Sequence, residues 1–279
     1  MPSRTLLTLA VAGLFVFASG CDKLKSRDHI NQGIAAYKNA KYPDAVEHFK
    51  QAIALDPDNP NARVYLATSY MIQWIPGADS PENNEFAAKA KSEFQKVLDK
   101  DPKDKTALAY MASLAYNQAG ALPPDKKTEK FDEAAAWYHK LIDVDPKNKE
   151  AYYSLGVIAW GRWYPVIMTA RANLRMKPED PGPLPDKKVK EQLRAQYSAV
   201  IEEGIQDLQK AIDIDNNYDD AMAYMNLLVR ERADLLDDKD EYNKQVAIAD
   251  GWMQKTVEAR KAKALAAEKA GASGITNDK

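Results

Sequence analysis

The chain has 279 residues, of which 45% are hydrophobic and 29% are charged. This hydrophobic fraction is normal for a globular protein and argues against a disordered chain. The formal net charge of −2 gives no basic field of the kind that nucleic-acid-binding proteins use. A single cysteine excludes an intrachain disulfide, so the fold must depend on packing.

Residues 1–20 have the pattern of a secretory signal peptide. Arg4 supplies a positive charge near the start, and an uncharged apolar run follows from Leu6 to Ala18. As a helix this run covers only about 20 Å, which is shorter than the roughly 30 Å hydrocarbon core of a membrane. The segment is therefore predicted to be a cleaved signal peptide and not a membrane span.

The end of this segment resembles a bacterial lipobox, in which a lipidated cysteine becomes the first residue of the mature chain. The sequence is Ala18-Ser19-Gly20-Cys21, with Ala18 where many such boxes carry leucine. The resemblance implies an acyl chain on Cys21, a short tether over residues 21–25, and a lipid-anchored protein of the bacterial cell envelope that faces the periplasm. It does not choose between the inner and the outer membrane. The alternative is ordinary cleavage that leaves a free thiol near the N-terminus.

One spacing pattern recurs four times along the chain. A small residue is followed after four positions by an aromatic residue or leucine, after three more by an apolar residue, and after five more by proline or asparagine. Offsets of four and three place the first three residues on one helix face, and a proline ends the helix. The copies are Ala45, Phe49, Ala52 and Pro57; Ala90, Phe94, Val97 and Pro102; Ala134, Tyr138, Leu141 and Pro146; and Gly204, Leu208, Ala211 and Asn216.

This combination of small, aromatic and terminal proline residues resembles the tetratricopeptide repeat, a pair of antiparallel helices. The resemblance implies an all-α fold, namely a right-handed solenoid of about five helix pairs over residues 26–268. A long helix near 240–268 is expected to cap the solenoid, and residues 269–279 are expected to form a disordered tail. An unrelated helical bundle is the alternative. The repeats are expected to begin near Ser26, Pro60, Lys105, Lys149 and Asp219.

Three insertions are predicted between the two helices of the second, third and fourth pairs. Successive prolines of the pattern are 45 and 44 residues apart, whereas a regular repeat takes about 34 residues. The extra residues contain proline and glycine, so they are predicted to form loops near 74–84, 119–128 and 161–187. Equivalent turns lie along one edge of a solenoid, which is often the binding side.

The resemblance further implies a protein–protein interaction module whose first helices line a concave face. A carboxylate clamp of the kind found in some family members is not expected, because Ile30 and Ile34 stand at the positions of its lysine and asparagine. The third insertion instead carries aromatic rings and arginines, which dominate interface hot spots. The alternative is that these rings only pack the insertion onto its own repeat. The predicted partner-binding residues are Tyr116, Tyr153, Trp160, Arg162, Trp163, Tyr164, Arg171 and Arg175.

No catalytic or metal-binding constellation is recognisable in the sequence. The histidines His29, His48 and His139 are not in a metal-binding spacing, and no serine lies in a G-x-S-x-G motif. We therefore expect no enzyme activity, no cofactor and no metal. The predicted function is an adaptor in the cell envelope that binds another protein or a peptide segment, and not nucleic acid. The alternative is a periplasmic ligand-binding module with an aromatic pocket near 153–164.

Overall fold

The computed structural model describes the backbone of residues 3–120 and 122–274, and the side chains of residues 21–120, 122–123 and 126–269. The described residues form ten α-helices and no strand. The chain divides into two compact units, Met1–Leu122 and Pro123–Lys279, and each is described by itself.

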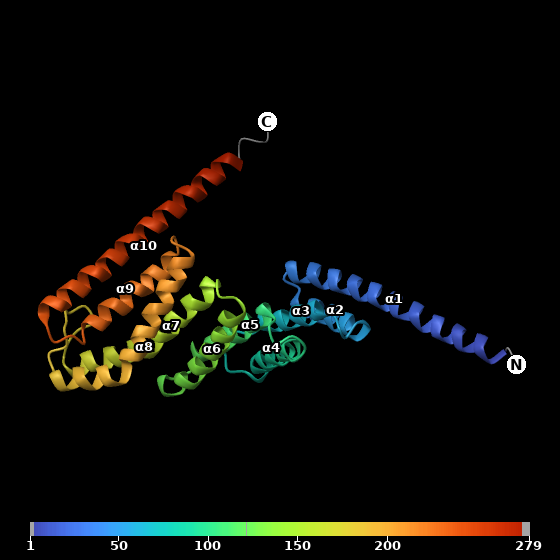
Figure 1. The fold of residues 1–279 in the computed structure, drawn as a ribbon, viewed down its shortest axis with the longest axis horizontal. Helices are drawn as coiled ribbons and strands as arrows, with labels where there is room; N and C mark the ends of the chain where they lie inside the picture. The colour runs from blue at the N-terminus through green and yellow to red at the C-terminus, as the bar shows by residue number, and fades with distance from the viewer. Residues whose placement is uncertain (1–2, 121, 275–279) are drawn as a thin grey trace. The chain divides into compact units, whose positions relative to one another are not determined.

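Unit 1 contains five helices, which pack in chain order. Each helix contacts the next one, and α3 also contacts α1 and α5. This is the contact pattern of stacked helix pairs (Figure 1). The helices are α1 (Ser3–Lys38), α2 (Tyr42–Leu55), α3 (Pro60–Met71), α4 (Pro81–Lys100) and α5 (Lys105–Gly120).

Unit 2 repeats this arrangement with longer helices. Neighbours in the chain again pack together, and α7 also contacts α9. The last helix lies alongside α9 and continues past it (Figure 1). The helices are α6 (Pro124–Val144), α7 (Lys149–Asn173), α8 (Lys187–Ile214), α9 (Asp219–Ala233) and α10 (Lys239–Gly274).

Short turns of one design join a helix pair to the next. Asp56 ends α2, and its carbonyl oxygen accepts a hydrogen bond from the backbone N–H of Asn59. The Asn59 side chain then accepts from two backbone N–H groups in the first turn of α3, which otherwise lack partners. The same arrangement occurs with Asp101 and Asp104 before α5, and with Asp145 and Asn148 before α7.

The residues of the recurring pattern form the core of each unit. Ala45, Phe49 and Ala52 are fully buried, as are the corresponding residues of the other three copies or nearly so. Each aromatic ring of the pattern in unit 1 stacks on the next first helix, with centroids 5.4 Å apart for Phe49 and Tyr65. The predicted all-α fold of tetratricopeptide-type helix pairs is thereby confirmed.

The predicted loops were too long, because the extra residues mostly lengthen helices. Nine residues, 72–80, separate α3 from α4, whereas only residues 121–123 lie between α5 and α6. The third insertion was expected at 161–187 with a separate short helix over 166–176, but α7 continues into it as far as Asn173 and the loop is 174–186. Pro165 lies inside α7. Its cost of about 3 kcal/mol is offset by complete burial of Trp163 and Ile167, which contributes roughly 1.5–3 kcal/mol for each side chain.

The ends of the chain also differ from the expectation. The segment 21–25, predicted to be a tether, belongs to α1, and Ser26 is the first fully buried residue among the side chains of α1 that are described. Ser26 Oγ donates to the carbonyl oxygen of Ala52 at 2.9 Å.

At the C-terminal end α10 runs to Gly274, so residues 269–274 of the predicted tail are helical. Residues 275–279, and the side chains of the predicted signal peptide 1–20, lie outside the described residues. Among the helices that are described, none has the length and apolarity to cross a membrane.

A substitution at Gly156 tests whether α7 and α8 approach each other closely. A Cβ atom at this position would lie 2.4 Å from Leu208 Cγ, and Leu208 is fully buried. We expect Gly156→Ala to lower the free energy of unfolding by about 1–3 kcal/mol, as overpacking does. Chemical denaturation measures the change.

Gly251→Ala in α10 is the control, because its Cβ would meet no atom within 4 Å. The control should be stabilised by up to about 1 kcal/mol through helix propensity. Equal effects of the two substitutions would contradict the tight contact.

Candidate binding site

A row of partly exposed aromatic rings runs along α7 and α9 of unit 2. Tyr153 of α7 packs against Tyr218 and Tyr224, with ring centroids 5.2 and 5.7 Å apart. Two turns further along α7, Trp160 meets Tyr224 edge to face at 5.5 Å and stacks on Tyr164 at 4.6 Å. Tyr164 is the most exposed of these rings, at 38%. We refer to these five rings as the aromatic strip.

The helical geometry of α7 decides which of its residues belong to the aromatic strip. Residues 153, 160 and 164 are spaced by seven and four, so they lie on one helix face. Arg162 and Trp163 fall between them in sequence and therefore point away. The prediction placed residues 161–164 in the third inserted loop, but α7 continues through this stretch and turns its side chains to different sides. The rings of Trp160 and Tyr164 thus lie together, whereas Arg162 and Trp163 serve other contacts.

Two of the predicted partner-binding residues are buried structural groups, which corrects the prediction. Trp163 is fully buried and packs against Tyr197. Arg171 is 4% exposed, and its Nη1 donates to Asp234 Oδ2 at 2.6 Å. Arg171 also donates to the carbonyl oxygens of Lys177 and Asp180, so it fastens the 174–186 loop to the end of α9. Neither side chain is accessible to a partner.

The remaining predicted residues lie at separate places. Arg162 forms an ion pair with Asp132 of α6. Arg175 is exposed at the start of the 174–186 loop, where its φ of 58° is in the left-handed region. Tyr116 is partly buried in α5 of unit 1, and Cys21 is an exposed free thiol in α1. The structure therefore brings together only Tyr153, Trp160 and Tyr164 of the predicted set.

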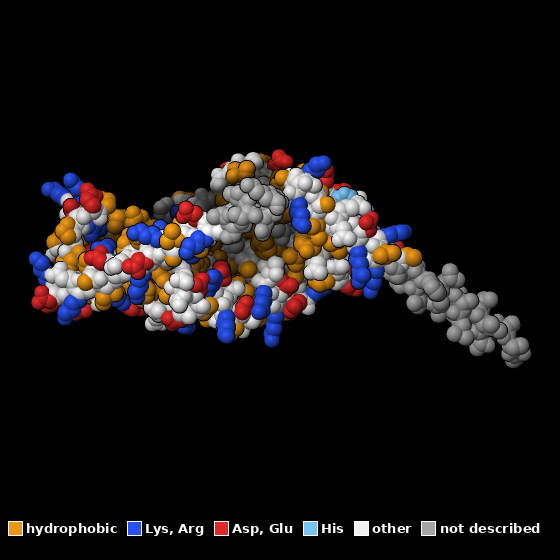
Figure 2. Space-filling view, turned by 90° about the horizontal axis from the view of Figure 1, so that it is seen from above, with side chains coloured by type: hydrophobic (Ala, Val, Ile, Leu, Met, Phe, Trp, Pro, Cys, Tyr) orange, Lys and Arg blue, Asp and Glu red, His pale blue; other side chains and the backbone are white. Residues whose placement is uncertain are grey.

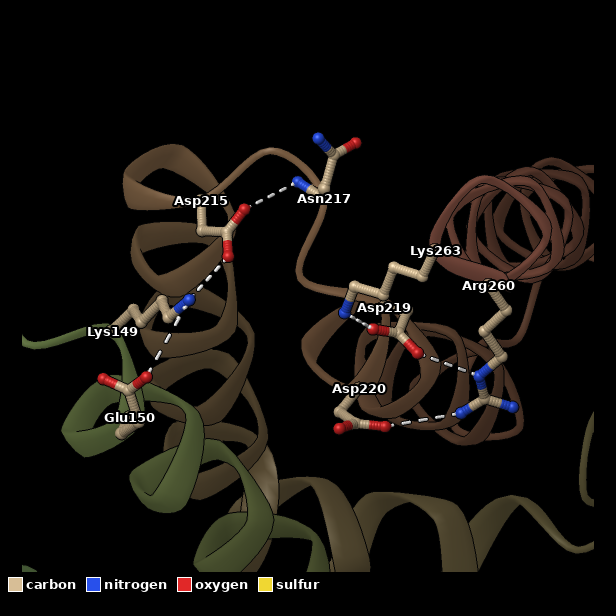
Figure 3. Close-up of polar contacts among 8 residues, drawn as sticks. All are labelled: Lys149, Glu150, Asp215, Asn217, Asp219, Asp220, Arg260 and Lys263. Atoms are coloured by element: carbon tan, nitrogen blue, oxygen red, sulfur yellow. Dashed lines mark hydrogen bonds and ion pairs between the residues drawn. The ribbon is translucent and has the colours of Figure 1, made fainter. Parts of the chain in front are cut away.

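Ion pairs lie at the start of α7 and α9 (Figure 3), and one of them is next to Tyr218 at the end of the aromatic strip. Lys149 Nζ lies 2.6 Å from Asp215 Oδ2 and 5.1 Å from the centre of the Tyr218 ring. Burial raises the pKa of the Tyr218 hydroxyl to about 12, so this group stays neutral. Asp219 sits in the first turn of α9, where a negative charge complements the helix dipole. It pairs with two cations of α10, Arg260 and Lys263.

A buried carboxyl group lies under the other end of the aromatic strip. Trp160 Nε1 donates to Glu231 Oε1 at 3.1 Å, and the second oxygen, Oε2, has no hydrogen-bond partner among the described residues. Glu231 is only 9% exposed. Burial is the main cause that raises its pKa from 4.5 to about 7, and the hydrogen bond from Trp160 opposes this change. The carboxyl group therefore changes charge near neutral pH, and it lies directly beneath the ring of Trp160.

The set predicted from sequence lacked two rings that the structure adds to this surface, Tyr218 and Tyr224. Both rings lie on or beside α9, far from the third insertion in sequence. Position within the repeat was the available signal, since first-helix residues were expected to line the binding face. Their side-chain pairing with α7 could not be read from one sequence. In the described residues no group of three or more histidine, cysteine or acidic side chains could hold a metal ion.

The helix pairs and the aromatic strip define an all-α repeat protein with a candidate protein-binding face. Comparison with known families identifies the repeat. Residues 33–73 match a model described as "TPR repeat", and residues 126–162 match one described as "Tetratricopeptide repeat". Each unit thus contains one segment that matches a tetratricopeptide-repeat model. No curated protein matches the chain.

Several solved structures are similar to the chain at low sequence identity. "MamA RS-1 ArsTM double mutant" is 16% identical with a TM-score of 0.51, over 86% of this chain and 96% of that one. "MamA 41-end from Desulfovibrio magneticus RS-1" is 15% identical with a TM-score of 0.49, over 85% and 96%. The first TPR domain of Spaghetti (RPAP3), bound to an HSP90 peptide, is 20% identical with a TM-score of 0.36, over 49% and 94%.

The pKa of Glu231 gives a pH-dependent prediction. The folded protein holds this proton more tightly than the unfolded chain does, because its pKa is about 7 instead of 4.5. The stabilisation is complete below pH 4.5 and is lost as the pH rises through 7. Glu231→Gln is neutral at every pH and avoids this loss. We expect the variant to be more stable than the parent at pH 8.5 by up to about 3 kcal/mol, at 1.36 kcal/mol per pKa unit.

Urea denaturation at pH 5 and pH 8.5 measures the difference. At pH 5 the parent and Glu231→Gln should have nearly the same stability. Glu258→Gln is the matched control, because Glu258 is exposed on α10 and should show no such pH dependence. An equal effect of Glu231→Gln at both pH values would argue against a neutral buried carboxyl.

Proposed function

We propose that the protein is a lipid-anchored adaptor that faces the periplasm and binds a partner protein on the aromatic strip of unit 2. Tetratricopeptide repeats in both units support a protein-interaction role, since the matched families describe repeats and not an enzyme. The aromatic strip is the observation that carries the proposal. Tyrosine and tryptophan rings that are partly exposed and fixed by their neighbours are the residue types enriched at interface hot spots.

The chemistry of the aromatic strip indicates the kind of segment that it would bind. The rings offer apolar and aromatic contact along two helices, with charged pairs at the start of α7 and α9. Beneath the rings, the buried carboxyl of Glu231 accepts a hydrogen bond from Trp160 Nε1 and so holds this ring in place. A peptide segment with apolar side chains fits these features.

The sequence supports the membrane anchor. Cys21 is the only cysteine, it is exposed, and it follows an apolar segment that starts near Arg4. Ser26 is the first residue that packs into unit 1, so about five residues would separate a lipid from the repeats. In helical form they span roughly 7 Å, and fully extended at most about 18 Å. An adaptor with such a short connection would act close to the membrane surface, for instance in envelope assembly.

Crosslinking in cells tests the partner-binding face. A photoreactive amino acid at position 164 should capture a specific protein, because Tyr164 is the exposed ring of the aromatic strip. The same reagent at position 169 is the control, since Thr169 is exposed on α7 nine residues from Trp160 and points to the opposite side. We expect Tyr164→Ala to weaken binding of the captured protein about tenfold. Capture at 169 but not at 164 would refute the proposed face.

A small molecule that copurifies in stoichiometric amount would instead support a ligand-binding role.

Replacement of Cys21 tests the anchor independently. Cys21→Ser should abolish metabolic labelling with a fatty-acid analogue, because the lipid cannot be attached to serine at this position. The protein should then move from the membrane fraction to the soluble fraction. Fractionation and mass measurement of the mature N-terminus check both effects. Asp22→Asn, one residue later, is the control and should keep the label. Full membrane association of the Cys21→Ser variant would contradict lipid anchoring.

A further inference from the structure

A second candidate site lies on the opposite side of α7 from the aromatic strip. A cavity of about 260 Å³ opens between α6 and α8, with α7 as its floor. Of the four residues that α7 contributes, Leu155, Ile158 and Arg162 are spaced by three and four and belong to the face turned away from Trp160. A volume below the 300–1,000 Å³ of typical drug-sized sites suits a single side chain or a small molecule.

The walls of this cavity combine an apolar floor with acidic groups. Leu155, Ile158 and Val200 supply apolar surface, whereas Glu203 and Asp207 of α8 supply carboxyl groups. These two acidic residues are four positions apart and so lie on the same face of α8. A ligand with a hydrocarbon stem and a positive end would match both parts of the cavity.

Asp207 is the carboxyl group that lacks a partner. It is partly buried, yet among the described residues it accepts no hydrogen bond and forms no ion pair. The nearby cations are engaged elsewhere. Arg162 pairs with Asp132, and the ammonium group of Lys210 lies 5.3 Å from the centre of the Tyr152 ring. A carboxylate that has lost part of its hydration without gaining a cation is unfavourable.

We propose that the cavity between α6 and α8 binds an alkylammonium group, with Asp207 and Glu203 as acceptors and the apolar floor against the methylene chain. An ammonium group is a compact charge with three donors, so it can bridge two carboxylates that do not form a single planar acceptor. The source is either a lysine side chain of a protein or a free diamine, and both present the same chemistry. This site is separate from the aromatic strip and does not depend on the function proposed for it.

The charges around Asp207 predict how binding varies with pH. Burial raises the pKa of Asp207 to about 6, which the neighbouring His139 and Lys210 oppose and Glu203 reinforces. An ammonium group binds only the ionised form, so affinity should fall as the pH decreases from 7.5 to 5. His139 of α6 faces the same cavity, and its protonation would add a repulsive charge that acts in the same direction. Arg162 of α7 stays positive throughout, and Asp132 neutralises it.

Calorimetric titration of the full chain tests the proposal with matched ligands. The probes are Nα-acetyl-lysine N-methylamide and 1,5-diaminopentane, and the control ligand is Nα-acetyl-norleucine N-methylamide, which has the stem without the ammonium group. We expect both amines to bind at pH 7.5 and the norleucine compound to bind at least tenfold more weakly. The better of the two amines identifies the source. Binding of the norleucine compound as tight as that of the amines, or no binding of either amine at 10 mM (about −2.7 kcal/mol by the affinity relation), would overturn the proposal.

Substitutions locate the binding group. Asp207→Asn keeps the shape and removes a partly buried charge, so it should fold and bind the amines at least tenfold more weakly. Asp213→Asn on the same helix is the control, since Asp213 is exposed and bonded to Gln209 outside the cavity, and it should leave affinity unchanged. Glu203→Gln, at an exposed position, should weaken binding two- to threefold. Unchanged affinity in both Asp207→Asn and Glu203→Gln would place the amine elsewhere and refute the site.

Discussion

The close approach of the two helices within each pair is the constraint on which the rest of the structure depends. Gly33 lies against the Phe49 ring and Gly156 against Leu208, and in both places a Cβ atom would come within 3 Å of the facing side chain. Because the helices are this close, the ring or leucine reaches across to the next first helix, as Phe49 does to Tyr65. The face that α7 and α9 present together, with its aromatic rings, is a consequence of this stacking.

The local pattern in the sequence was sufficient for the core and the turns, and the reason is that both depend on near neighbours. Offsets of four and three identified faces that are buried, such as that of Ala90 and Phe94. Glycine and proline signals misplaced the end of α7, because the loop predicted from residue 161 begins only at residue 174. Burial of Trp163 and Ile167 against distant helices stabilises the helix there, and this information is absent from the local sequence.

The candidate site was only partly predictable because its key contacts join residues far apart in the chain. Trp160 and Glu231 are separated by 71 positions, and Arg171 and Asp234 by 63. Composition correctly singled out the 160–164 stretch as aromatic and basic, but it could not assign each ring to a face. Once α7 is known to be helical, the spacing of 160, 162, 163 and 164 separates accessible rings from structural ones.

Charge on this protein is mixed over the visible surface, with acidic and basic side chains interspersed and no extended field of one sign (Figure 2). Recognition at the face shown would therefore rest on local groups and not on a long-range field. On one side of α7 these are rings above the buried carboxyl of Glu231, and on the other side they are the carboxyl groups of Asp207 and Glu203 beside an apolar floor. The two sides differ in chemistry because α7 is held between α9 and the pair α6 and α8. One helix thus contributes to two unlike surfaces, and a partner that contacts only one of them leaves the other accessible.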